Sequence, residues 1–285
     1  MLDPEEYVEQ AYFFQILLDR LGQNIPLQDL LEQSKFELLA STKLPLAIDL
    51  MLAELKHKGL MSSGMRMLEH YFTPFQTFLM SEAELDVGKF DYRTALKILA
   101  AESEYRAGES LSPQGLFFFQ FEAISRNRLT YDRGLDAISK DPVYSEDWPS
   151  WILLVRQQLG LADLAEMIFA RSEFQKERSK RFAADEVDFP VLFGLSEGKI
   201  AFANRRKDPL FLFAAMQRHL GYPEVPRLEP PDPIPELVPQ LARRIERLES
   251  RLKLMEEEQR GGIDITKFYE GGAIPDVSDR GSGSR

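Results

Sequence analysis

The sequence predicts a mainly α-helical protein, and three features support this prediction. Apolar residues recur at three- and four-residue spacing through most of residues 1–184. Short clusters of Gly, Ser, Pro and Asp separate these segments, which favours helix hairpins. With 44% hydrophobic residues among 285, the chain can bury a large core, although it contains no cysteine. We therefore expect an irregular helical bundle or a short α-solenoid-like array of helix hairpins over residues 1–184.

Residues at the predicted helix ends locate the first elements. Asp3 and Pro4 form an N-cap and first-turn pair, and Gly59 is a typical helix terminator. Pro74 removes a backbone donor within a helical pattern, so we expect it to kink or split that helix. Helices are predicted at residues 4–21, 26–40, 46–58, 65–79, 92–106, 113–128, 132–139, 146–159, 161–178 and 209–220.

Residues 185–221 are predicted to form a small module of a β-hairpin and a helix. Alternating apolar residues suggest a first strand, residues 196–199 supply turn chemistry, and a second strand follows. The strand residues are Val187, Phe189, Val191, Phe193, Ile200 and Phe202. The helix at 209–220 is expected to cover one face of this hairpin.

A proline-rich linker at residues 222–237 leads into a predicted parallel homodimeric coiled coil at residues 238–260. An apolar residue occupies each a and d position of three heptads, which favours pairing with a second copy of the chain. These residues are Val238, Leu241, Ile245, Leu248, Leu252 and Met255. The alternative is a helix that folds back on its own body.

Residues 261–285 are rich in Gly and Ser, so we expect a disordered tail. An apolar island within it, formed by Ile263, Ile265, Phe268 and Tyr269, is typical of a segment that docks onto an unidentified protein partner. The alternative is an inert tail.

Catalytic and metal-binding motifs find little support. Ser196 lies in a G-x-S-x-G match, the nucleophile motif of hydrolases, but the predicted strands around it do not suit that motif. A hydrolase that uses Ser196 is therefore a disfavoured alternative. The chain has three histidines and one Glu-x-x-His unit, Glu54 with His57, so we expect no metal and no cofactor.

The formal net charge of -11 disfavours nucleic acid and anionic lipid as partners. Within this acidic chain, Arg205, Arg206 and Lys207 form a candidate anion-binding cluster. A winged-helix DNA-binding regulator, with its helix at 46–60 and its wing strands at 62–75, is an alternative disfavoured by Asp49 and Glu54.

The start of the chain is acidic, and its apolar stretches fall short of the ~20 residues that a membrane-spanning helix needs. We therefore expect a cytoplasmic protein without a membrane partner. Its expected function is that of a non-catalytic interaction or scaffold protein that oligomerises through the coiled coil.

Overall fold

The structure is a computed structural model of the full chain, and it describes residues 1–23, 25–85, 90–181, 189–227, 248, 252 and 255. The chain divides into two units, Met1–Leu228 and Glu229–Arg285. Thirteen α-helices and two short 3-10 helices make up the described part, where β pairing is limited to two isolated bridges. The prediction of a mainly helical protein is confirmed. No helix in the described ranges has the length and apolar character required to cross a membrane.

The helices follow one another with short connections. Their bounds are α1 (Pro4–Arg20), η1 (Leu21–Gln23), α2 (Leu27–Ser34), η2 (Lys35–Glu37), α3 (Leu44–Lys58), α4 (Met61–Met67), α5 (Pro74–Ala83), α6 (Tyr92–Ala107), α7 (Pro113–Arg126), α8 (Tyr131–Ser139), α9 (Trp148–Gln158), α10 (Leu164–Ala170), α11 (Glu173–Arg181), α12 (Leu195–Asn204) and α13 (Pro209–Leu220).

Helix ends in the first part of the chain lie where the local signals place them. Asp3 is the N-cap of α1, although its side chain makes no capping hydrogen bond. Gly59 ends α3 in the left-handed conformation, with a φ of 75°, which costs glycine little. Pro74 is the first residue of α5, and the preceding Thr73 forms a capping box with Gln76. The expected split of the helix at this proline is therefore confirmed.

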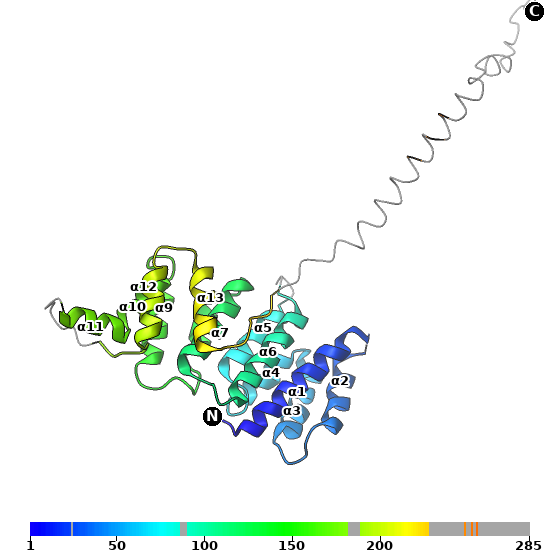
Figure 1. Cartoon of the computed structure of the whole chain (residues 1–285). Helices are drawn as coiled ribbons and strands as arrows, with labels where there is room; N and C mark the ends of the chain where they lie inside the picture. The colour runs from blue at the N-terminus through cyan, green and yellow to red at the C-terminus, as the bar shows by residue number, and fades with distance from the viewer. Residues whose placement is uncertain are drawn as a thin grey trace, which may run out of the picture. The chain divides into compact units, whose positions relative to one another are not determined.

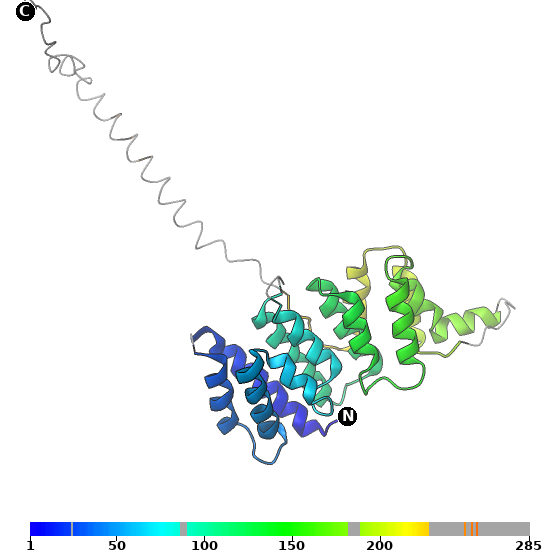
Figure 2. The same cartoon turned by 180° about the vertical axis from the view of Figure 1, so that it is seen from behind.

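Within the first unit, α1–α3 lie at one end and α10–α12 at the other (Figures 1 and 2). Helix α1 packs along α6, α5 packs against α8, and α10 packs against α12. Aromatic side chains fill much of the core between these pairs. Phe193, for example, lies with its ring centroid 5.3 Å from that of Trp148 and 5.1 Å from that of Trp151.

The predicted β-hairpin is wrong. The expected turn and second strand instead form α12, which begins after Gly194. Gly198, a turn residue by sequence, packs so closely on the start of α11 that a Cβ there would lie 2.7 Å from Cβ of Phe174 and 2.4 Å from Oγ of the preceding Ser172. In the expected first strand, Phe189 is half exposed and Phe193 makes a single bridge to Ser172. Contacts between distant segments therefore override the local alternation.

The predicted single helix at residues 161–178 is also wrong, because it divides into α10 and α11. The backbone at the break bonds to the returning chain. Leu192 donates its N–H to the Arg171 carbonyl at 2.9 Å, and the Glu173 N–H donates to the Phe193 carbonyl at 2.9 Å. These long-range bonds replace the helical ones that would have continued α10 through Arg171.

Candidate functional site

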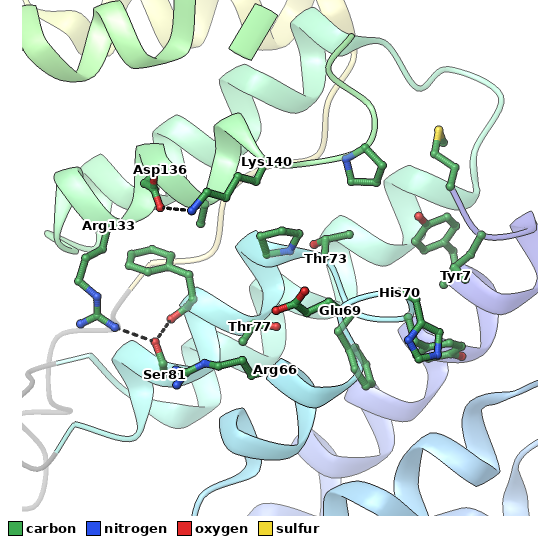
Figure 3. Close-up of a pocket in the computed structure, with 18 residues that line it drawn as sticks. Tyr7, Arg66, Glu69, His70, Thr73, Thr77, Ser81, Arg133, Asp136 and Lys140 are labelled. Atoms are coloured by element: carbon green, nitrogen blue, oxygen red, sulfur yellow. Dashed lines mark hydrogen bonds and ion pairs between the residues drawn. The ribbon is translucent and has the colours of Figure 1, made fainter. Parts of the chain in front are cut away.

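A groove with a volume of about 710 Å³ lies between α5 and α8. The end of α4 and the loop that follows it form a third wall, and Tyr7 lies at one end (Figure 3). Ligand sites in proteins are commonly concave and of this size. We call this feature the α5–α8 groove.

One face of α5 forms the floor. Pro74, Thr77, Phe78 and Ser81 line the groove at the spacing that places residues on one side of a helix. The capping box between Thr73 and Gln76, with bonds of 3.3 and 3.0 Å, fixes where this face begins. The floor therefore presents small hydroxyl side chains next to an aromatic ring.

The opposite wall has the same spacing on α8, through Arg133, Asp136, Ala137 and the residue after the helix, Lys140. Gly134 lets α8 approach its neighbours closely, because a Cβ there would lie 2.5 Å from Cδ1 of the buried Ile124. The absence of a side chain at this position thus sets how near α8 lies to α5 and α7.

Charges along the groove are mixed but locally positive. Three cations, Arg66, Arg133 and Lys140, line it with two carboxylates, Glu69 and Asp136. The whole chain instead has 35 Lys and Arg against 46 Asp and Glu. The groove is therefore a place where an acidic protein presents positive charge.

Two of these cations are held by neighbouring groups. Arg133 Nη1 lies 3.0 Å from Oε1 of the buried Glu82, and its Nη2 donates to Ser81 Oγ at 3.2 Å. Lys140 Nζ lies 2.7 Å from Asp136 Oδ2, and Arg156 Nη1 lies 3.5 Å from the other oxygen of that carboxylate. Ser81 Oγ donates to the Phe78 carbonyl at 2.7 Å, so its proton is already used in the helix.

A buried ionic network lies behind the Tyr7 end of the groove. The Arg106 guanidinium lies 5.9 Å from the centre of the Tyr7 ring and is fully buried. It donates to Glu102 Oε1 at 2.8 Å and to both oxygens of Asp141, whose loop follows α8. Gln120 of α7 also donates to Glu102, at 2.7 Å. The network therefore ties α6, α7 and the α8–α9 loop together.

Burial raises the pKa of the Glu102 carboxyl, while Arg106 acts in the opposite direction. Burial also raises the pKa of the Tyr7 hydroxyl. Both effects follow from removing charged forms from water. Since the ring of Tyr7 separates these groups from the groove, we assign the network to the architecture rather than to ligand contact.

The candidate anion cluster is a turn outside the α5–α8 groove. Arg205 stacks over the rings of Phe202 and Phe169, with its Cζ 3.9 and 5.0 Å from their centres. Arg206 has a φ of 58°, and its N–H donates to Asp163 Oδ2 at 2.6 Å. Lys207 is exposed. The three side chains adjoin in sequence, but Arg205 is committed to the two rings.

The remaining predicted residues are Ser196, the coiled-coil residues and the apolar island of the tail. Ser196 is exposed in the first turn of α12. Of the predicted coiled-coil residues, Leu248, Leu252 and Met255 are helical and more than half exposed. The others of that set, together with the apolar island of the tail, lie outside the described residues: Val238, Leu241, Ile245, Ile263, Ile265, Phe268 and Tyr269.

Two further sequence expectations bear on the kind of site. The winged-helix alternative has its wing strands at residues 62–75, but 62–67 belong to α4 and 74–75 begin α5. Glu54 of the Glu-x-x-His unit pairs with Lys58 at 2.7 Å and accepts a hydrogen bond from Ser63. In the described ranges, no three His, Asp or Glu side chains are grouped so that they could hold a metal ion.

The groove residues were missed by sequence reasoning because they come from segments far apart in the chain. Arg66 and Arg133, for example, belong to α4 and α8. The spacing of polar residues over 133–140 could have indicated the α8 wall of the groove, although it is equally typical of a solvated helix face.

No protein-family model, curated protein or solved structure matches the chain. Function is therefore inferred from the geometry of the site itself.

Proposed function

We propose that this protein is a non-catalytic interaction protein whose α5–α8 groove binds an extended segment of a partner protein. A coiled coil of residues 238–260 would join two copies of the chain, and the island at 263–269 would serve as a second docking segment. The single observation that carries the proposal is the groove, with its volume of about 710 Å³ and its lining of hydroxyl, aromatic and charged side chains.

The length of the groove suits a short stretch of extended chain. Its floor runs from Pro74 to Ser81 on α5, which corresponds to a rise of about 10 Å along a helix. An extended peptide advances ~3.3 Å per residue, so about three residues would lie over this floor. Thr77 and the charged side chains of the walls offer hydrogen-bond partners for the peptide backbone.

Charge favours a partner segment with acidic character. The groove lining is locally positive in a chain whose net charge is -11, so an acidic segment would meet attraction here and repulsion over much of the remaining surface. This contrast would direct the segment to the groove.

The test uses random 12-residue peptides displayed on phage, selected on the full-length protein. Thr77→Trp fills the groove without changing its charge, and Gln15→Trp places the same side chain on the exposed face of α1. We expect the selected peptides to bind the wild type and Gln15→Trp, and to lose binding to Thr77→Trp. Selected peptides that bind all three proteins equally, or a selection without enrichment, would contradict the proposal.

A further inference from the structure

We infer that the end of the α5–α8 groove where Arg66 and Arg133 lie beside Ser81 is an anion subsite, in which the two arginines bind a carboxylate or phosphate side chain of the partner segment. This inference rests on the proposed function and adds the chemistry of the partner. In Figure 3 the three residues lie toward one end of the groove, and Tyr7 and His70 lie toward the other.

Arg133 is positioned in advance for such a contact. Glu82 and Ser81 each hold one of its terminal nitrogens, and its Cζ lies 5.9 Å from the centre of the Phe78 ring. Glu82 is fixed in turn by Thr130, whose hydroxyl donates to Oε2 at 3.1 Å. A guanidinium has five N–H donors, so these two contacts leave donors on a side chain that is 52% exposed.

Arg66 supplies a positive charge that is not held in an ion pair. Arg133 and the buried Glu82 neutralise each other, whereas Arg66 is exposed and forms no ion pair or hydrogen bond with the residues that the structure describes. An oxyanion placed between the two guanidinium groups would offset the positive charge of Arg66. Arginine suits this task because its planar fork matches carboxylate and phosphate oxygens.

The two carboxylates that line the groove differ in how they affect an anion that binds at this end. Asp136 is bound by Lys140 and Arg156. Glu69 is exposed and makes no ion pair within the described ranges, so it is the one carboxylate of the lining that would repel an incoming anion. Its removal should therefore strengthen binding.

The opposite end gives the segment a direction. Tyr7 and His70 lie there (Figure 3), so it offers two rings in place of the arginines of the subsite. A segment that fits both ends would carry an acidic residue and, about three residues away, an apolar one.

The experiment measures the binding of individual selected peptides to the full-length protein, using fluorescence anisotropy. Each peptide is compared with a version in which its acidic residue is replaced by the isosteric amide. We expect a loss of about tenfold or more on the wild type, as for a charge-assisted hydrogen bond. Arg66→Gln should remove most of this difference, and Glu69→Gln should increase affinity for the acidic form.

Arg66→Gln is the first variant because its side chain has no internal partner to lose, while Arg133→Gln would leave Glu82 unpaired. Arg218→Gln, on the exposed face of α13, is the matched control and should leave the difference unchanged. A phosphoserine version of each peptide separates the two sources: tighter binding than the glutamate version identifies phosphate, and equal or weaker binding identifies carboxylate.

Two results overturn the subsite and leave the proposed function standing. One is a set of groove-dependent peptides without a shared acidic residue. The other is an amide effect of the same size in Arg66→Gln as in the wild type. Failure of the Thr77→Trp test would instead overturn the proposed function itself, so the two failures are distinguishable.

Discussion

Replacing Arg106 by methionine should destabilise the fold severely. Methionine keeps a long, unbranched side chain at this position but removes three charge-assisted hydrogen bonds to Glu102 and Asp141. Bonds to charged groups contribute about 1.5–3 kcal/mol each, and removing one partner of a buried ion pair costs about 3–5 kcal/mol because the remaining charge stays buried. Since Arg106 and both carboxylates have no exposed surface, we expect a loss in the upper part of that range.

The loss should depend on pH. Arg106 lowers the pKa of Glu102 against the effect of burial, so its removal raises the folded-state pKa further. A carboxyl with a raised folded-state pKa contributes stability below its unfolded pKa of about 4.3, and this contribution is lost as the pH rises through the folded pKa. The deficit of Arg106→Met should therefore be largest near pH 7 and smaller near pH 5.

Chemical denaturation, followed by the fluorescence of the buried Trp148 and Trp151, measures both effects. Adding Glu102→Gln and Asp141→Asn to Arg106→Met should recover part of the stability, since no buried charge is then left unpaired. A deficit below about 1 kcal/mol at pH 7, where breaking a buried pair should cost ~3–5 kcal/mol, would refute this account of the network. So would a deficit that is equal at pH 5 and pH 7.

Three further predictions concern other parts of the chain. Gly134→Ala should lower the free energy of unfolding by about 1 kcal/mol, because overpacking against Ile124 costs ~1–3 kcal/mol and exceeds the gain in helix propensity. The control is Gly108→Ala, where the added Cβ meets no atom closer than 3.4 Å. Equal stability of the two variants would count against the close packing of α8. Leu248→Asp should convert a dimer of the full-length protein into a monomer at tens of micromolar, as measured by light scattering, and a wild-type monomer would end the coiled-coil proposal. A fluorophosphonate probe should give no labelling that depends on Ser196, because the hydroxyl is exposed on α12 rather than placed at a strained turn; labelling that disappears in the alanine variant would show the opposite.

Sequence patterns located the helices wherever the deciding signal was local. The start of α1 at Pro4 and the split at Pro74 depend on residues next to them in the chain. The hairpin failed because Gly198 was interpreted from its neighbours as a turn residue, whereas it packs against α11. No local pattern reports that kind of contact.

The candidate site was harder to predict for the same reason. Arg66 and Arg133 share a groove only after α4, α5 and α8 have assembled. Glu102 and Arg106 were visible as a pair four residues apart, which is the spacing of an ordinary surface ion pair. Their complete burial depends on Asp141 and on the helices around them, so the sequence pattern alone could not distinguish the two cases.

The two carboxylate oxygens of Asp163 accept hydrogen bonds from two segments that are far apart in the chain. Oδ1 accepts from the Ala165 N–H at the start of α10, and Oδ2 accepts from the Arg206 N–H in the turn after α12. Neither stretch can open without releasing the shared group, so the two should unfold as one cooperative unit. Native-state hydrogen exchange should therefore give the amides of Ala165 and Arg206 the same opening free energy, and Asp163→Asn should lower both together.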